Sequence, residues 1–572
     1  MSCFSHRFSR RVCRLAKHAL LLVSLTMLCA AFAHAAQPPE PWPEDYELTL
    51  TVSLEKAEAD YAALQPALDR AVQEAESGKS VRVLVGPGMY RGEFSLQGLP
   101  GNEYAPISIE AEEPGRAILC GSRVVDGWEV GDSGYFQMDF PAGERVVGLY
   151  VQSVRVEQVR ADRRLRQGQF RVVQEGSPFE GYQVQMIQPE NATVADGLVE
   201  VATEVPGGIL RIRDLDTVTL SGLYLRQGGG IGVLVKDCRR VRVEHATSEH
   251  QHISGYRFED ITELKLINAD ALRNGKEGIK AANVAAMDVI GGATSNNGYR
   301  TGVDMMSADA FGMQCQSVKE LSLRNFQAAD NLGAGLGAYY ADTVSLRSSK
   351  LLNNRLGAVF YHDKNVTLKE TIVAANSSGG LMAMGSDCTA MWSIFTGNGG
   401  RESGVYVAQL AAMDGAKLSF KHCIVSATQA DIPLLAIDDL GVLGEISGNL
   451  YWGSDEPFIF ADIIPDKAGD RGRPSLDFAG WQAVSGQDLD SAWGDPMFND
   501  PASFEFIPLG ESIWYQQKTW PVRELAEGEM AAARESYLPQ ANTSDAHGPT
   551  VPDPFETLPS APEKDSGFTD KK

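Results

Sequence analysis

Two short stretches, RNGKEGIK at residues 273–280 and NNGYRTGVD at residues 296–304, decide the fold. Each places an Asn-Gly pair before a short apolar segment, and Asn274 and Asn297 lie 23 residues apart. Asn and Gly both tolerate the left-handed backbone conformation that a sharp turn needs. A turn that recurs at this interval indicates a chain built from repeated structural units.

An alternating apolar pattern shares the period of the turns. Apolar-x-apolar triplets begin at Val218, Val241, Leu264, Met287, Leu321, Val344 and Val366. Successive starts differ by 23, 23, 23, 34, 23 and 22 residues, and the interval of 34 is one repeat plus an 11-residue insertion. Asparagine follows ten residues after the later starts and then recurs once more, at Asn274, Asn297, Asn331, Asn354, Asn376 and Asn398.

The alternation predicts β-strands with one face turned inward. A repeat of 23 residues is short for a helical repeat, and the segments lack a sustained helical period. We therefore predict an all-β chain that forms a parallel β-helix (β-solenoid), with one coil per repeat and the Asn-Gly turns at its corners. Asparagines at one fixed corner can hydrogen-bond to their copies in the next coil.

The asparagine row at residues 274–398 and the stretch at residues 81–128 resemble the right-handed parallel β-helix proteins of the pectate-lyase-like superfamily. The resemblance covers roughly residues 50–510 and implies a right-handed solenoid. Secreted members mostly act on polysaccharides, so it also implies a carbohydrate-active enzyme with a polysaccharide or oligosaccharide substrate. It does not imply one reaction, because this fold supports many activities.

The start of the chain predicts export. Residues 1–35 combine a basic segment, an apolar run and an Ala-His-Ala site, which is typical of a signal peptide and indicates a periplasmic or extracellular protein. This segment carries five basic and no acidic residues, so its removal changes the formal net charge from −24 to −29. Such a chain is a poor partner for nucleic acid, which needs a positive surface. We expect a monomer with no membrane span.

The remaining segments are expected to differ in structure along the chain. Residues 129–210 lack the period, and a projecting strand pair is predicted there. The predicted boundaries are a linker and first strand at 36–56, a capping helix at 57–78, the parallel β-helix at 79–510 with regular coils at about 216–425, a closing segment at 511–539 and a disordered tail at 540–572.

The cysteines after residue 35 do not predict a metal site. They are widely spread and contain no CxxC pair: Cys120, Cys238, Cys315, Cys388 and Cys423. We expect most of these cysteines to be buried thiols. One disulfide is possible, because an exported protein folds in an oxidising compartment. The sequence predicts no cofactor and leaves calcium open.

The coil register predicts a charged outer face on the strand that follows each Asn-Gly turn. Lys280 is expected to point outward, with Arg257 and Glu259 one coil earlier and Asp304 one coil later, on a strand at 303–306. Further outward or corner residues are expected to bind substrate: His252, Glu277, Tyr299, Arg300, Asp309, Tyr339 and His362. The same side chains would suit a solvent-exposed charge ladder, which contributes little to stability. Their coincidence with the insertion favours a substrate groove.

Hydrolysis is the first predicted reaction. Glu259 and Asp304 would lie two coils apart, roughly 9.6 Å, which suits the two carboxylates of an inverting glycoside hydrolase. Lys280 lies between them, and Asp309 or Glu277 can replace either carboxylate in this scheme.

Elimination is the alternative. A polysaccharide lyase or C5-epimerase acting on a uronate polymer needs a base and a cation that stabilises an enolate. Lys280 with Arg257 or Arg300 fits those roles, and Tyr299, Tyr339 or His362 can donate the proton. A third hypothesis is a non-catalytic carbohydrate-binding or surface β-solenoid.

Overall fold

The computed structural model describes residues 41–131, 133–173, 181–194, 198–299, 310–400, 408–438, 441, 443–460 and 475–516. The predicted signal peptide and the predicted disordered tail lie outside these residues. Within them, no helix is both long and apolar enough to cross a bilayer.

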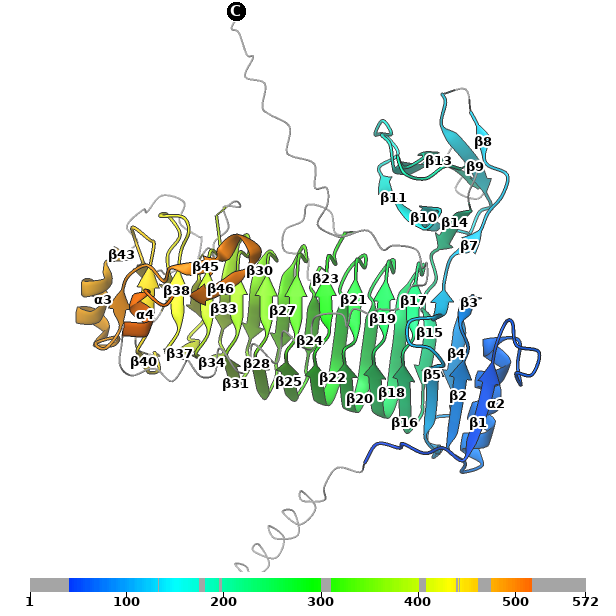
Figure 1. Ribbon diagram of the computed structural model, residues 1–572, viewed down its shortest axis with the longest axis horizontal. Coiled ribbons are helices and arrows are strands. Elements are labelled where there is room, and N and C mark those ends of the chain that lie inside the picture. The colour runs from blue at the N-terminus through cyan, green and yellow to red at the C-terminus, as the bar shows by residue number, and fades with distance from the viewer. Residues whose placement is uncertain are drawn as a thin grey trace, which may run out of the picture. The chain divides into compact units, whose positions relative to one another are not determined.

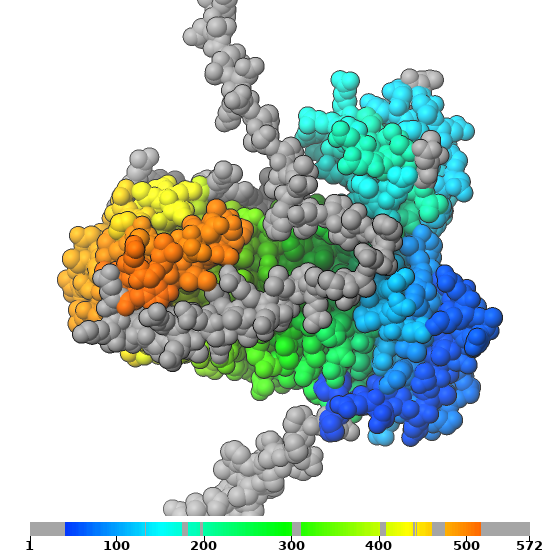
Figure 2. All heavy atoms as spheres, viewed as in Figure 1, coloured from blue at the N-terminus to red at the C-terminus, as the bar shows by residue number. Residues whose placement is uncertain are grey.

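Each regular coil contributes three consecutive strand segments. In one coil, β22 (Ile279–Ile290) supplies the first and second segments, which are separated by a left-handed Asn283 (φ 56°), and β23 (Ala293–Ser295) supplies the third. Each segment pairs in parallel with the same segment of the neighbouring coils, as Ile279 does with Tyr256. The coils therefore stack in chain order, and their colours follow one another from blue to orange in Figures 1 and 2.

Stacking of equivalent segments produces three rows of parallel strands. The first row contains β4 (Phe94–Gln97), β15 (Gly208–Arg213), the first halves of β18 (Ile231–Glu244), β20 (Tyr256–Ile267) and β22, then β24 (Met313–Gln316), β27 (Ala334–Tyr339), β30 (Leu356–Tyr361), β33 (Gly379–Met384), β36 (Leu410–Met413), β39 (Leu435–Ile437) and β42 (Phe458–Phe460). The second row contains β1 (Leu48–Val52), β2 (Val81–Val85), β5 (Ile107–Ala111), β16 (Thr217–Ser221), the second halves of β18, β20 and β22, then β25 (Glu320–Arg324), β28 (Thr343–Arg347), β31 (Asn365–Lys369), β34 (Asp387–Met391), β37 (Lys417–Lys421) and β40 (Ile446–Ser447).

The third row forms a sheet of its own. It contains β3 (Gly88–Arg91), β6 (Ala117–Cys120), β17 (Tyr224–Arg226), β19 (Thr247–Glu249), β21 (Asp270–Leu272), β23, β26 (Gln327–Ala329), β29 (Lys350–Leu352), β32 (Ile372–Ala374), β35 (Ile394–Thr396), β38 (Ile424–Ser426), β41 (Leu450–Trp452) and β44 (Ala492–Trp493). We call the turn from the third row to the first row the Asn corner, and the turn from the first row to the second row the first–second corner.

Alternate side chains of each row fill the interior. Tyr256, Phe258, Ile279 and Ala281 are fully buried, as the apolar alternation predicts. Burial of one large apolar side chain contributes about 1.5–3 kcal/mol, and the same positions repeat in every coil. The five cysteines after residue 35 are also buried and all are free thiols. Burial raises the pKa of Cys238 and of Cys423 to about 12.

The asparagines form a continuous hydrogen-bonded ladder inside the Asn corner. Asn274 donates from its backbone N and its Nδ2 to Asn297 Oδ1, both at 3.0 Å. The pattern repeats through Asn331, Asn354, Asn376 and Asn398. Glutamine extends it at both ends, because Asn274 accepts from Gln251 N and Gln409 Oε1 accepts from Asn398.

The chain makes its long excursions at the Asn corner. One excursion separates β6 from β15, a second separates β23 from β24, and a third separates β35 from β36. The coils on either side still pair directly across the first excursion, since Leu210 pairs with Phe94 and Leu225 with Leu119. Loops of different lengths therefore emerge along one edge of the first row.

The first excursion folds as an eight-stranded sheet, which we call the appended sheet. Its strands are β7 (Arg123–Val124), β8 (Glu129–Val130), β9 (Phe136–Phe140), β10 (Val146–Val151), β11 (Val154–Val159), β12 (Gln169–Val173), β13 (Tyr182–Ile187) and β14 (Val199–Thr203). It has its own hydrophobic cluster around Leu149, Phe170 and Val184. β10 and β11 form an antiparallel pair.

A helix and several short elements lie at the two ends of the stack. The helix α2 (Leu64–Glu76) packs against β1, β2 and β4. It begins later than residue 57, because Tyr61 pairs with β1 instead: Tyr61 N donates to Thr51 O, and Ser53 N donates to Tyr61 O. The C-terminal elements are β43 (Ser475–Leu476), α3 (Phe478–Ser485), β45 (Phe498–Asp500), β46 (Glu505–Pro508) and α4 (Ile513–Gln516). The fully buried Trp481 stacks on Phe458 with ring centroids 5.0 Å apart.

Candidate functional site

The outer face of the first row carries charged side chains in neighbouring strands. Arg257 of β20 lies beside Lys280 of β22, and Gln314 of β24 follows in the same register. Glu259 lies two residues farther along β20, beside Lys236 of β18. Neighbouring strands lie about 4.8 Å apart, so Arg257 and Lys280 present two cations within one coil spacing.

Glu277 holds Lys280 from the Asn corner. Lys280 Nζ lies 3.1 Å from Glu277 Oε1, and Ser254 Oγ donates to Glu277 Oε2 at 2.8 Å. The side chain of Glu277 is only 3% exposed, whereas that of Lys280 is 22% exposed. The carboxylate therefore anchors the lysine from beneath and leaves the ammonium group at the surface.

Glu259 belongs to a second ion-paired group. Arg257 Nε donates to Glu259 Oε1 at 2.7 Å, and Lys236 Nζ lies 3.4 Å from Glu259 Oε2. Lys236 also lies 3.4 Å from an Asp260 oxygen. All four side chains are partly exposed, so this group lines the surface next to the Glu277–Lys280 pair.

Gln314 is the buried polar residue of this face, and sequence reasoning missed it. The residue is 7% exposed, and within the described part of the chain its Oε1 has no hydrogen-bond partner. A buried acceptor without a partner costs about 1–3 kcal/mol, and in native proteins it calls for an explanation such as a bound molecule. The signal that could have revealed Gln314 in the sequence is its position one coil after Lys280, in the pattern Gly-Met-Gln-Cys at 312–315.

The expected register, which places residues 303–306 one coil after Lys280, is wrong. β24 at Met313–Gln316 pairs with β22, so Gln314 and not Asp304 follows Lys280. Asp304, with Arg300 and Asp309, lies outside the described residues. The hydrolytic pair of Glu259 with Asp304 therefore stays a prediction.

His252 and Tyr299 lie at the Asn corner and not on the first-row face. His252 is 3% exposed, and its backbone N donates to Gly228 O at 2.8 Å. Tyr299 Oη donates to Gln251 O at 2.9 Å, and the guanidinium of Arg155 from the appended sheet lies 3.4 Å from the centre of the Tyr299 ring. These two residues support the corner, with Tyr299 also contacting the appended sheet.

Tyr339 and His362 lie farther along the stack. Tyr339 packs edge-on against Phe311, with ring centroids 6.2 Å apart. Burial raises the pKa of Tyr339 to about 12, so its hydroxyl keeps its proton at neutral pH. His362 is exposed on the first–second corner, one residue past β30. The predicted residues thus fall into a charged group at Arg257–Lys280 and an aromatic group two to three coils on.

Comparison with known proteins identifies the fold. No protein-family model matches the chain, and no curated protein matches its sequence. Among similar solved structures, the complex of XylC with xylose has a TM-score of 0.51 at 10% identity and covers 79% of this chain and 87% of that chain. The chain has the right-handed parallel β-helix fold. The fold class predicted from the repeat is confirmed.

Other structures similar to this β-helix share less of its geometry. The catalytic unit of the GH87 α-1,3-glucanase from Streptomyces thermodiastaticus has a TM-score of 0.39 at 10% identity, and covers 75% of this chain and 72% of that chain. The A-module of the mannuronan C-5 epimerase AlgE4 from Azotobacter vinelandii has a TM-score of 0.34 at 11% identity, and covers 76% of this chain and 99% of that chain.

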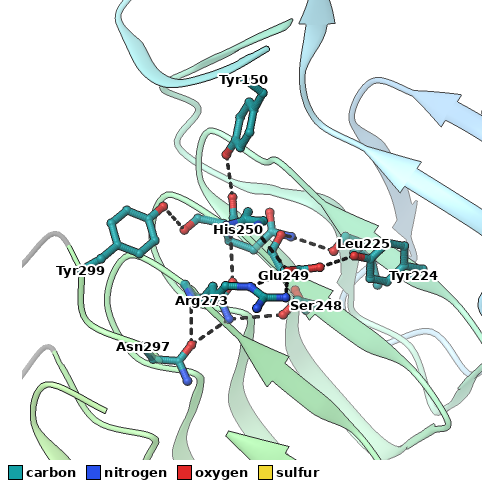
Figure 3. Close-up of polar contacts among 11 residues, drawn as sticks. Tyr150, Tyr224, Leu225, Ser248, Glu249, His250, Arg273, Asn297 and Tyr299 are labelled. Atoms are coloured by element: carbon teal, nitrogen blue, oxygen red, sulfur yellow. Dashed lines mark hydrogen bonds and ion pairs between the residues drawn. The ribbon is translucent and has the colours of Figure 1, made fainter. Parts of the chain in front are cut away.

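The β-helix contains a second polar cluster, which sequence reasoning also missed (Figure 3). Glu249 accepts hydrogen bonds from the Tyr224 hydroxyl and from Arg273 Nε, and His250 Nε2 lies 3.3 Å from its Oε1. Burial is the main cause that lowers the pKa of His250 to about 4, so the imidazole is neutral. Tyr150 of the appended sheet donates to His250 O at 3.1 Å. The repeat could have revealed this cluster, because Tyr224 and Arg273 each lie about one coil from Glu249.

The clusters of this β-helix do not resemble a metal centre. Among the described residues, no group of three or more His, Cys, Asp or Glu side chains is arranged to hold a metal ion. What the described site offers is two neighbouring cations, a buried carboxylate and an acceptor without a partner.

Proposed function

We propose that this β-helix protein is an exported polysaccharide-active enzyme, and that its substrate binds the first-row face at Arg257, Lys280 and Gln314. The observation that carries the proposal is the buried Gln314 oxygen without a partner, one coil from the anchored Lys280. A sugar hydroxyl would satisfy this acceptor, and a sugar carboxylate would suit the two cations. XylC, which shares the fold, was solved with xylose, and this supports a carbohydrate ligand.

The first candidate reaction is proton abstraction beside a uronate carboxylate, leading to elimination or C5-epimerisation. Arg257 and Lys280 lie in neighbouring strands, where they would bind the substrate carboxylate and stabilise the charge of the enolate. Glu259, whose carboxylate is held at the surface by Arg257 and Lys236, would take the C5 proton as the base. Tyr339, whose hydroxyl keeps its proton, would suit the later donation of a proton to the sugar.

Inverting hydrolysis is the second candidate, and Glu259 favours it. Its two oxygens contact Arg257 and Lys236, which fixes the carboxylate on the surface where a base would be needed. The acid would have to come from another carboxylate. Glu277 is too far along the chain to fill that role, because five residues of extended chain separate its position from that of Glu259, roughly 16 Å.

The test is a polysaccharide panel read in three ways. New reducing ends with ultraviolet absorbance would support elimination, and reducing ends without absorbance would support hydrolysis. Deuterium uptake at C5 without chain cleavage would support epimerisation. No change in any of these, across neutral and acidic polymers, would contradict the proposed function.

The matched variants separate the site from the fold. The double variant Glu277→Gln/Lys280→Met removes both partners, so that no buried charge is left unpaired. We expect activity to fall at least about 100-fold, the usual effect of removing one group that stabilises transition-state charge. Lys265→Met, on the outer face of the second row, is the control and should keep full activity. Equal activity in both variants would contradict the assignment of Lys280.

A further inference from the structure

Two aromatic rings form an exposed stack on the first–second corner. Tyr340 is 56% exposed, and its ring lies over that of His362 with centroids 5.9 Å apart and an interplanar angle of 19°. Tyr361 closes one edge of the stack, with its ring perpendicular to that of Tyr340 at 5.6 Å. A rigid, flat and partly apolar surface of this kind is typical of a ligand contact.

The residues at the equivalent corner of other coils show what the backbone alone requires. Asn283, Ser317, Tyr340, His362 and Gly385 occupy this corner in successive coils, and each has a positive φ. Asn and Gly suit that conformation, whereas bulky side chains enter it at a cost. The turn therefore does not explain the choice of tyrosine and histidine.

The neighbours on either side set the size of the stack. A side chain at Gly385 would meet the His362 ring at 2.5 Å, so glycine leaves room for that ring. Ser317 lies one coil before Tyr340 and is too small to cover the other face of the tyrosine ring. The stack thus lacks one flat layer on the side that leads towards Gln314 and Lys280.

We propose that a sugar ring of the polymer takes this missing layer and stacks on Tyr340 through its C–H face. This inference rests on the proposed function and adds a subsite to it. Tyr340 lies two coils from Lys280, about 10 Å along the stack, and three residues farther along its strand, about 10 Å across the face. The bound sugar would therefore be two or three residues from the reacting unit. The subsite would make the enzyme prefer polymers and longer oligosaccharides to disaccharides.

The chain contains a matched comparison for this stack. Trp392 and His422 stack on another corner with centroids 6.4 Å apart, and a side chain at Gly448 would meet the His422 ring at 2.6 Å. There, however, Lys369 Nζ lies 4.7 Å from the centre of the Trp392 ring and takes the place of a ligand. The two stacks share their local structure and differ in whether one face is covered.

The experiment compares Tyr340→Asn with Trp392→Asn. Asparagine is chosen because Asn283 occupies the same corner in β22, so the Tyr340 variant should fold with an unchanged unfolding midpoint. We expect Tyr340→Asn to raise KM for a long oligosaccharide about tenfold, because the variant loses the flat aromatic face on which the sugar would stack. The kcat, and kcat/KM for the shortest cleaved substrate, should stay unchanged.

Binding gives an independent readout. In the Glu277→Gln/Lys280→Met background, retardation of the protein by immobilised polymer in a native gel should weaken with Tyr340→Asn and persist with Trp392→Asn and with Tyr340→Phe. Equal KM and retardation in the Tyr340→Asn variant and its parent would overturn the subsite while leaving the proposed function intact. Absence of activity and retardation in the wild-type protein would overturn both.

Discussion

At the scale of single residues, the site is defined by groups that the fold alone does not need. The interior of the first row is filled by the inward neighbours of position 314, Met313 and Cys315, and does not require a glutamine there. The glutamine there is buried with its carbonyl oxygen lacking a partner among the described residues, and it lies next to a lysine that a buried glutamate holds in place. Such a position lowers stability in the free protein and favours a ligand that supplies the missing hydrogen bond.

Gln314→Leu tests this trade between stability and binding. Removal of the unsatisfied acceptor should leave the free energy of unfolding unchanged or raise it by about 1 kcal/mol, while kcat/KM falls at least about tenfold. Urea unfolding and kinetics on the same preparation measure both. Gln316→Leu, at the exposed end of the same strand, is the control. A Gln314→Leu variant that loses stability and keeps full activity would show that the glutamine is structural.

At the scale of structural elements, hydrogen bonds at the corners join the coils in addition to those of the strands. Asn354 lies in the middle of the ladder, where its Nδ2 donates to Ala328 O and Asn376 Oδ1 and its Oδ1 accepts from Asn331. Asn354→Ala leaves several buried polar groups unsatisfied, and we expect it to cost about 3–5 kcal/mol. Asn365→Ala, on an exposed strand position, should cost under about 0.5 kcal/mol. Similar midpoints in urea for the two variants would contradict the role of the ladder.

The first–second corner contains a buried acid with a pH signature. Asp363 is 1% exposed and accepts from Ala341 N at 2.7 Å and Tyr361 N at 3.1 Å, beneath the Tyr340–His362 stack. Burial is the main cause that raises its pKa from 3.8 to about 6. The folded protein therefore holds this proton between pH 4 and pH 6, whereas the unfolded chain releases it, so stability falls as the pH rises through this window. The difference spans roughly 3 kcal/mol.

Asp363→Asn isolates that contribution. The free energy of unfolding of the wild type minus that of the variant should decrease by up to ~3 kcal/mol between pH 4 and pH 7. Urea titrations at several pH values measure it. Asp330→Asn, on an exposed corner, supplies a baseline. A difference that is constant with pH would show that Asp363 does not retain its proton on folding.

At the scale of the whole molecule, polar contacts join the appended sheet to the coils of the β-helix. Glu200 of the appended sheet is 2% exposed; one of its oxygens lies 2.5 Å from Arg91 of β3, and the other lies 3.9 Å from Arg226 of β17. Arg155 adds its contact with Tyr299 at the Asn corner. The sheet and the coils each have their own cluster of buried apolar residues. We therefore expect cooperative unfolding of the appended sheet with the coils to depend on these polar contacts.

Glu200→Gln should weaken that coupling. Two arginines would lose their carboxylate partner, which costs about 3–5 kcal/mol for a buried ion pair. We expect calorimetry to resolve two unfolding transitions in the variant and a single one in the wild type, with the appended sheet unfolding first. Glu157→Gln, on the exposed side of β11, should behave as the wild type. A single unshifted transition in Glu200→Gln would contradict the role of this contact.

The sequence predicted the regular parts of this molecule because their contacts repeat. Strands, corners and the Asn ladder recur every coil, so a residue type at a fixed interval indicates its neighbours. The insertion broke that logic, because both GVDM at 302–305 and GMQC at 312–315 satisfy the Gly-apolar-x-apolar pattern. The backbone decides for Gly312, which packs against Gly278 so closely that a Cβ on Gly278 would lie 2.6 Å from Gly312 O.

Contacts that do not recur at the coil interval could not be predicted from the repeat. The bond between Tyr150 and His250 joins residues 100 positions apart, and the sequence of the appended sheet has no coil register that would predict it. Gln251 and Gln409 were missed for a different reason. They continue the ladder with one more methylene group than asparagine, and their Oε1 atoms accept the ladder hydrogen bonds from Gly228 N and Asn398 Nδ2.

The five buried thiols give the protein a practical property. Once residues 1–35 are absent, every cysteine lies in the interior, and a reagent in solution cannot reach any of them until a coil opens. A thiol-reactive dye would then report opening of the native state directly, coil by coil, by mass spectrometry of the labelled peptides. For the same reason, one cysteine introduced at the exposed Leu332 would be the sole point of attachment, so that a fluorophore could follow a polymer chain moving along the coils.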